Sequence, residues 1–235
     1  MPISRQCGLF FLFLSLSAPA SPAQTVLPII SEYTGQADGS FQVRNETLAP
    51  FAVVLEARSF GVTLEGVPVY RSLDADVAVT LSAKSFRVPP HRAYTVFYKA
   101  RSQKLPAWFT IYSDIQAKPT TPGVQVVIRL PHTVYLLTKD EPRRSDVVIS
   151  QGIFNPVTRQ VTFTIENKSE SFGRVQTVEL RSLAGRQSYG GFPCFPRQKR
   201  LVVLDWKNPI PPNSVEIAFP KFKFEVPFPA YLSGP

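Results

Sequence analysis

The side chains that could carry out acid–base or metal chemistry are few and widely separated in this sequence. Only two histidines are present, His91 in a turn after two prolines and His132 in a strand-like run, and neither has a Cys, Asp or Glu at metal-ligand spacing. Asp74 and Asp76 have a spacing that favours turn hydrogen bonding over a paired-acid site, and calcium would need more oxygen ligands. The chain has no GxSxG, HExxH, CxxC or glycine-rich phosphate loop. We therefore expect no catalytic site, no metal and no cofactor.

The first residues have the pattern of a secretory signal peptide. Arg5 supplies a positive charge, the run from Gly8 to Leu16 is apolar except at Ser15, and small residues end the segment at Ala23. The apolar run is shorter than the roughly 20 residues of a membrane-spanning helix, although an uncleaved anchor is the alternative. We expect residues 1–23 to be a removed signal and the remainder to be exported and not inserted into a membrane.

Cysteine content and charge set further limits on the exported part. Cys7 lies in the signal segment, so Cys194 would stand alone and no internal disulfide could form, which leaves the hydrophobic cores to stabilise the fold. The net charge of +9 falls to +8 without Arg5, and its basic residues occur in short groups such as Arg143-Arg144. This scatter is typical of a solvated basic surface and argues against a nucleic-acid partner.

Strand-like runs dominate the chain after residue 24. The 23 prolines would interrupt most long helices, and short β-branched and aromatic runs recur between Pro, Gly and Asn. A polar, charged stretch from Thr138 to Asp146 separates two such series and is typical of a linker. We expect an all-β fold of two immunoglobulin-like sandwiches in tandem, with domains at 24–140 and 141–235. The predicted strands are Thr25 to Glu32, Ser40 to Val43, Phe51 to Phe60, Val77 to Leu81, Ala93 to Ala100, Trp108 to Ile115, Val124 to Leu137, Asp146 to Ile149, Val161 to Glu166, Arg174 to Leu183, Leu201 to Trp206, Ser214 to Phe219 and Phe222 to Val226.

The order of these segments resembles that of the periplasmic, PapD-like chaperones of the chaperone–usher pilus pathway. Each similar motif is short, and together they extend over nearly the whole exported chain. The motifs are strand 40–43 with Asn45, Leu48-Ala49-Pro50 before strand 51–60, Leu81 to Pro90, Lys104-Leu105-Pro106 before Trp108 to Tyr112, Gln125 to Leu137, Ile165 to Lys168 with Val178 to Leu180, and Phe192 to Pro196.

The resemblance implies a mechanism in which the last strand of the first domain is lent to a client. Pilus subunits are sandwiches that lack one strand, and the chaperone supplies an edge strand whose alternate apolar side chains fill the client's groove. Here the alternating positions are Val124, Val126, Ile128 and Leu130, which lie on one face of a strand. The alternative is that this face packs into the chain's own core.

The sequence departs from the family where the family binds a client's terminal carboxylate. Matching by position puts Ile30 and Thr133 where the family has an Arg and a Lys. Arg129 and His132 lie close by, so the candidate carboxylate anchor is Arg129, His132 and Thr133, although Arg129 would project from the face opposite the apolar row. Pro131 removes a main-chain donor from the strand, which an edge strand tolerates but which limits pairing.

The resemblance therefore implies a periplasmic, ATP-independent chaperone, and not an enzyme, whose two domains meet at an angle in an L shape. Such a chaperone caps pilus- or fimbria-like subunits and passes them to an outer-membrane usher. Self-association through the donor edge is a further expectation. Two alternatives stay open, namely a secreted immunoglobulin-like adhesion or scaffold protein and a carbohydrate-binding or hydrolytic sandwich. The second lacks a paired-acid site.

Overall fold

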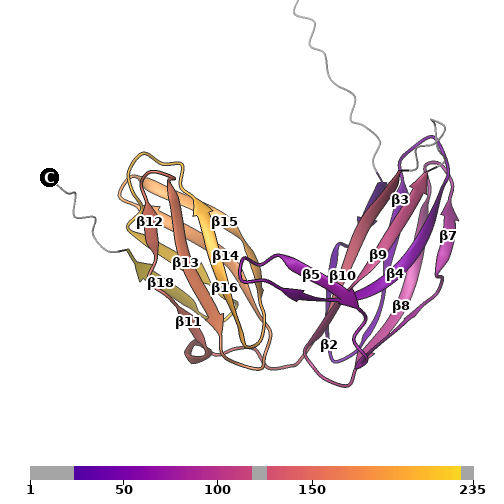
Figure 1. The fold of residues 1–235 in the computed structure, drawn as a ribbon, viewed down its shortest axis with the longest axis horizontal. Helices are drawn as coiled ribbons and strands as arrows, with labels where there is room; N and C mark the ends of the chain where they lie inside the picture. Colours follow the sequence, from indigo (N-terminus) through magenta and orange to yellow (C-terminus); the bar gives the residue numbers. More distant parts are fainter. Residues whose placement is uncertain (1–23, 118–125, 229–235) are drawn as a thin grey trace, which may run out of the picture.

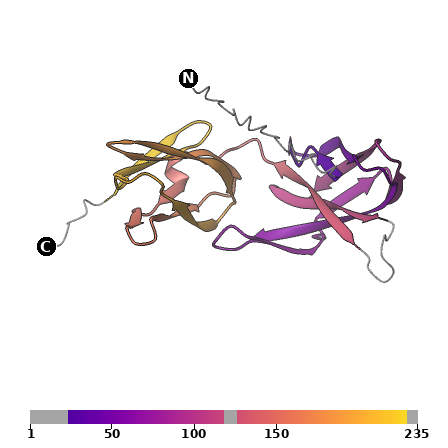
Figure 2. The same cartoon turned by 90° about the horizontal axis from the view of Figure 1, so that it is seen from above.

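A computed structural model describes residues 24–117 and 126–228 of the chain. The expected signal segment and Val124 lie outside these residues. The described elements are eighteen strands and one short 3₁₀ helix, η1 (Arg144–Asp146). The strands form two lobes that stand at an angle to each other (Figure 1), and a single connection near residue 140 passes between them (Figure 2). The expectation of two all-β sandwiches in tandem is confirmed.

The first sandwich is built from strands β1 to β10. One sheet has the order β1-β3-β8-β6, and the other has the order β2-β10-β9-β4-β5, with β7 also paired to β4. Alternate side chains from both sheets, such as Phe41, Val96, Phe109 and Ile111, are buried between them and form one core. The strands are β1 (Gln24–Leu27), β2 (Ile30–Thr34), β3 (Ala37–Asn45), β4 (Phe51–Val62), β5 (Pro68–Ser72), β6 (Val77–Leu81), β7 (Ser85–Val88), β8 (Ala93–Ser102), β9 (Ala107–Ala117) and β10 (Val127–Leu137).

The second sandwich contains the remaining strands and has a separate core. In one sheet β13 pairs with β11 and β12 on one side and with β16 on the other, and the second sheet has the order β15-β14-β17-β18. Phe163, Val178, Ile217 and Trp206 lie in the core between them. The strands are β11 (Val147–Ile149), β12 (Ile153–Asn155), β13 (Gln160–Asn167), β14 (Gly173–Ser182), β15 (Gly185–Cys194), β16 (Gln198–Asp205), β17 (Ser214–Ala218) and β18 (Lys223–Pro227).

The structure corrects the strand prediction at one functionally important place. The segment Thr25 to Glu32, predicted as one strand, is divided at Pro28 into β1 and β2, and these belong to different sheets. Proline has no N–H and a fixed φ, so it favours the point where the chain leaves one ladder for another. β5, β7, β12 and β15 were not predicted, and β15 contains Gly190 and Pro193, residue types that are depleted in strands.

A buried asparagine ends the corresponding strand in each sandwich. Asn45, at the end of β3, donates from Nδ2 to the carbonyl of Val88 (3.1 Å), and its Oδ1 accepts from the amide two residues further on (2.9 Å). Asn167, at the end of β13, makes the same bonds with the carbonyl of Cys194 (3.1 Å) and the amide two residues on (3.0 Å). Each side chain thus satisfies main-chain groups of a turn, which explains the burial of both.

An aromatic cluster joins the two sandwiches. Phe60 and Tyr135 from the first sandwich are buried against Phe172 and Phe195 from the second. The Tyr135 and Phe172 ring centroids are 5.1 Å apart, and those of Phe60 and Phe195 are 6.2 Å apart. Because Tyr135 belongs to the C-terminal half of β10, this half of the strand is held at the contact between the sandwiches.

Polar contacts support this junction. The hairpin between β4 and β5 extends toward the second sandwich (Figure 1), where the carbonyl of Leu64 accepts a hydrogen bond from the amide of Leu201 (2.7 Å). A second polar contact is the ion pair between Glu32 of β2 and Arg174 of β14. The sheet that contains β10 therefore has its outer face turned toward the second sandwich.

Candidate functional site

Half of β10 is an open sheet edge. β10 pairs with β9 from Val127 to Leu136, but on its other side β2 pairs only from Thr133 to Leu137. Among the described residues no strand pairs with this other side between Val127 and His132. Main-chain donors and acceptors on an unpaired edge are a ready template for another strand. The open edge of β10, defined as residues 127–132, is therefore the first feature of the candidate site.

The direction of the main-chain groups along this edge follows from one hydrogen bond. The amide of Thr133 points away from β9 and donates to the carbonyl of Ile29 (2.7 Å). Alternate residues of a strand direct their main-chain groups to the same side, so Val127, Arg129 and Pro131 also face away from β9. The residues between them pair with β9. The open side therefore offers N–H and C=O groups from Val127 and Arg129, and only a C=O from Pro131.

The described members of the predicted apolar row follow the core-facing side of β10 and become more exposed from Leu130 toward Val126. His132, like Val134 and Leu136, is fully buried, whereas Ile128 and Leu130 are half-buried and pack against the same core. Val126, just before the strand, is 56% exposed. The sequence left open whether this row enters a client or packs into the chain's own core. Both descriptions apply to parts of one face, because the row packs on the core at Leu130 and reaches the surface at Val126.

Three exposed apolar residues lie beside the open edge, and the sequence interpretation missed them. Leu27 ends β1, while Ile29 and Ile30 lead into β2, and about half of each side chain is exposed. Ile29 bonds to Thr133 through its main chain, and Ile30 is the register partner of Thr133. We call Leu27, Ile29 and Ile30 the apolar rim. The signal that could have revealed it is an apolar run interrupted by Pro28, which forces a change of sheet.

His132 is enclosed within the first sandwich. Its ring stacks on Phe41 with 4.6 Å between centroids, Nδ1 lies 2.7 Å from the carbonyl oxygen of Pro28, and Nε2 lies 3.0 Å from the Tyr98 hydroxyl. Burial lowers the pKa of His132, and the hydrogen bond to Pro28 partly opposes this effect. In this conformation both ring nitrogens are engaged, so His132 presents no donor at the surface to a client carboxylate.

Arg129 projects from the opposite, outer face and is already paired. Its guanidinium bonds to Asp114 (2.6 Å), lies 3.6 Å from Glu56, and stands over the Tyr112 ring at 5.0 Å from the centroid. The hydrogen bond from Arg129 holds the pKa of the Asp114 carboxyl below its usual range. Arg129 therefore has the direction that the anchor hypothesis required, but two carboxylates balance its charge. Burial raises the pKa of Tyr112, so this hydroxyl stays neutral.

Arg58 is a second basic residue on the same face that the sequence interpretation missed. In the sheet register, Arg58 stands opposite Thr110, which stands opposite Thr133, and Thr133 stands opposite Ile30. The Thr110 and Thr133 hydroxyls are 3.2 Å apart. Arg58 pairs with Glu56 at 2.8 Å. The basic group on the row of Ile30 and Thr133 thus comes from β4, which no sequence spacing could reveal.

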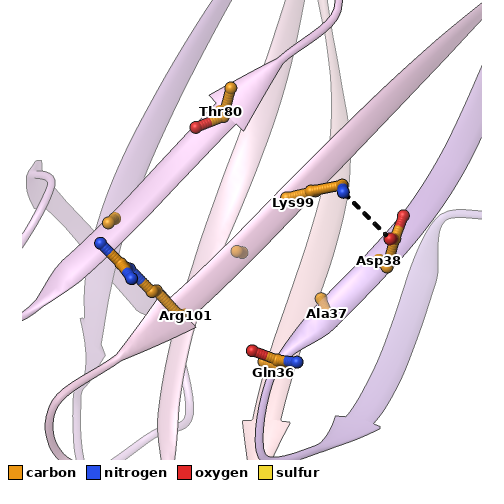
Figure 3. Close-up of a pocket in the computed structure, with 8 residues that line it drawn as sticks. Gln36, Ala37, Asp38, Thr80, Lys99 and Arg101 are labelled. Atoms are coloured by element: carbon orange, nitrogen blue, oxygen red, sulfur yellow. Dashed lines mark ion pairs between the residues drawn. The ribbon is translucent and has the colours of Figure 1, made fainter.

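One further hollow lies away from the β10 edge. A shallow hollow of about 390 Å³ on the outer face of the sheet β1-β3-β8-β6 is lined mostly by exposed side chains, and Lys99 extends toward Asp38 there (3.6 Å, Figure 3). Within residues 24–117 and 126–228, no three His, Cys, Asp or Glu side chains group closely enough to hold a metal ion. Those residues also include no helix that is long and apolar enough to cross a membrane.

Comparison with known proteins gives a likeness in fold. No family model matches the chain, and no curated protein sequence matches it. The crystal structure of the class 5 fimbriae chaperone CfaA has a TM-score of 0.55 at 11% identity and covers 88% of this chain and 99% of its own. The YadV chaperone structure has a TM-score of 0.53 at 11% identity, covering 83% of this chain and 91% of that chain.

A third similar structure comes from a chaperone–tip adhesin complex described as vital for synergistic activation of CFA/I fimbriae biogenesis. It has a TM-score of 0.51 at 11% identity and covers 88% of this chain and 98% of that chain. These similarities show that the chain has the PapD-like fold of two-domain chaperones. At such low identity they show the fold alone.

Proposed function

We propose that this protein is a periplasmic, ATP-independent chaperone that caps pilus- or fimbria-like subunits with the open edge of β10. The observation that carries the proposal is the coincidence of unpaired main-chain groups and an apolar row on one short stretch of strand. A client sandwich that lacks a strand offers the complementary groups, namely unpaired edges and an apolar groove. The fold shared with solved fimbrial chaperones supports this assignment.

In this proposal the row Val124, Val126, Ile128 and Leu130 enters the client groove, and the apolar rim widens the contact. Val126 contributes most among the described members, because it is the most exposed and so gains the most burial. Leu130 and Ile128 already pack on the chain's own core and contribute less. A client that replaces water at this edge would also cover the rim residues at the start of β2.

In this proposal the carboxylate anchor contributes less to client binding than main-chain pairing and apolar burial do. The charges of Arg58 and Arg129 are balanced by Glu56 and Asp114, so a client carboxylate would compete with two resident carboxylates for the same guanidinium groups. Such exchange of ion pairs in a half-exposed site is weak and salt-sensitive. We therefore propose that main-chain pairing and apolar burial hold the client, and that Arg129 mainly affects the rate of encounter.

The test is co-expression with secreted proteins encoded by neighbouring genes, followed by purification of a one-to-one complex. Val126→Asp should reduce the affinity for the captured subunit by at least about 100-fold, because a carboxylate would be buried in an apolar groove. Val127→Asp is a matched control, since Val127 is 49% exposed, adjoins Val126 and faces the other way. Equal effects of the two substitutions would show that the face is wrongly assigned.

The alternative of an adhesion or scaffold protein predicts a different result in the same experiment. The exported chain would then be stable and monomeric beside every candidate subunit, and no complex would form with the unsubstituted protein. An outer-membrane usher encoded next to the gene would support the chaperone. Delivery of the complex to that usher is the second step to be measured.

A further inference from the structure

Pro131 stands at the boundary between the paired and unpaired parts of the β10 edge. On one side Thr133 bonds to the segment that leads into β2, and on the other side Arg129 and Val127 are open. By the alternation of main-chain directions, the nitrogen of Pro131 faces the open side. The register with β9 continues through Pro131, which stands opposite Tyr112. The proline therefore leaves the β9 ladder intact and removes one donor from the open side alone.

We propose that Pro131 makes Arg129 the last residue of the open edge with a free main-chain N–H. The missing donor thereby limits edge-to-edge pairing between two copies of this chain. The inference needs the open edge but no client, so it holds or fails independently of the proposed function. An edge proline is one of the ways in which sheets are protected from unwanted pairing. Here protection is needed because the edge adjoins exposed apolar side chains, namely Val126, Val127 and the apolar rim.

The main-chain directions along the open edge permit a symmetric pairing of two copies. Antiparallel pairing related by a twofold axis at Arg129 would place residue 131 of each copy opposite Val127 of the other. The amide of residue 131 would then donate to the Val127 carbonyl, which proline cannot do. Symmetry makes this loss occur twice. Two such bonds correspond to a roughly 30-fold weaker association, which is about 2 kcal/mol at 1.4 kcal/mol per tenfold.

Charge is the competing explanation for a protected edge. In the same pairing, the two Arg129 side chains would stand opposite each other, and like charges directly opposite destabilise a strand pair. In this chain each Arg129 is bonded to Asp114 and lies near Glu56, so the repulsion is largely neutralised. The missing donor at Pro131 is therefore expected to have the larger effect, and the two causes can be separated by substitution.

The experiment is sedimentation equilibrium of the exported chain with three single substitutions. Pro131→Ala should raise the association constant roughly 30-fold. Pro211→Ala, the same change in a described segment outside any strand, should leave the constant unchanged. Arg129→Ala should have a smaller effect than Pro131→Ala. An unchanged constant for Pro131→Ala, or a rise seen only for Arg129→Ala, would overturn the proposal.

Amide hydrogen exchange of the Pro131→Ala variant provides a second measurement. The new amide of residue 131 should exchange rapidly in dilute solution and slowly in the associated form, whereas the Leu130 amide should be slow in both, because it faces β9. If the residue 131 amide were already protected in the dilute monomer, it would face β9 as well. The assignment of the missing donor to the open side would then be wrong.

Discussion

His132 should make the stability of the first sandwich depend on pH, and the expected size can be worked out from its contacts. The Pro28 carbonyl, 2.7 Å from Nδ1, can only accept a hydrogen bond, so the neutral ring carries its proton on Nδ1. Nε2 then accepts from the Tyr98 hydroxyl at 3.0 Å. Protonation of Nε2 would turn this acceptor into a donor inside a closed apolar site that contains Phe41.

The sign of the pH effect follows from the lowered pKa of His132 in the folded chain. Its unfolded pKa is about 6.5, so below this pH the unfolded chain binds more protons at this residue than the folded chain does. The contribution of His132 to the free energy of unfolding is complete above about pH 6.5. It falls by at most about 1.4 kcal/mol per pH unit as the pH decreases toward the lowered, folded pKa.

The assay is urea unfolding of the unsubstituted chain and of His132→Phe at pH 7.5, 6.5 and 5.5 (about one unit to either side of the unfolded pKa). At the highest pH the variant should be less stable by about 2 kcal/mol, because the Pro28 carbonyl and the Tyr98 hydroxyl each lose a hydrogen bond to the ring, although the Tyr98 hydroxyl keeps its bond to Tyr33. This difference should narrow at the lowest pH, since only the unsubstituted chain has a histidine to protonate. Carboxyl groups such as that of Asp114 titrate in both proteins, so their contributions cancel in the difference between the two free energies of unfolding. A difference that stays constant over this range would refute the reasoning.

Three further predictions concern other sites. Burial raises the pKa of the Cys194 thiol to about 12, so a thiol reagent should fail to modify it in the folded chain and should modify it fully in urea. Asn45→Ala should lower the free energy of unfolding by about 2 to 3 kcal/mol in urea titrations, because it removes the hydrogen bonds from the buried Asn45 to the carbonyls of Val88 and Pro89 and the bond that it accepts from the amide of Thr47. Arg129→Ala should change stability by less than about 1 kcal/mol but should raise the pKa of Asp114 toward its ordinary value, as measured by NMR titration.

The sequence was sufficient to predict the two sandwiches and the apolar row, because both depend on local alternation. In Val161 to Ile165, for example, every second residue is apolar, and those residues are buried in β13. The row from Val126 to Leu130 follows the same rule. Period-two patterning shows which residues share a face, but it does not show how deeply each part of that face is buried.

The rest of the site depends on pairing between distant segments, which local patterning does not contain. The open edge exists because β2 covers β10 only from Thr133 onward, and this limit is set by the change of sheet at Pro28. Likewise, Arg58 shares a row with Thr133 only through the β4–β9–β10 register. The sequence suggests His132 as an anchor because it adjoins Thr133, whereas its partners Pro28 and Tyr98 are remote in the chain.

The most direct test of the central claim is amide hydrogen exchange along β10 in the free chain and in a purified complex with a captured subunit. If the open edge pairs with the client, exchange at Val127 and Arg129 should be fast in the free chain and at least about 100-fold slower in the complex. The Leu130 amide, which faces β9, should be slow in both. A stable complex in which Val127 and Arg129 exchange as fast as in the free chain would contradict the account.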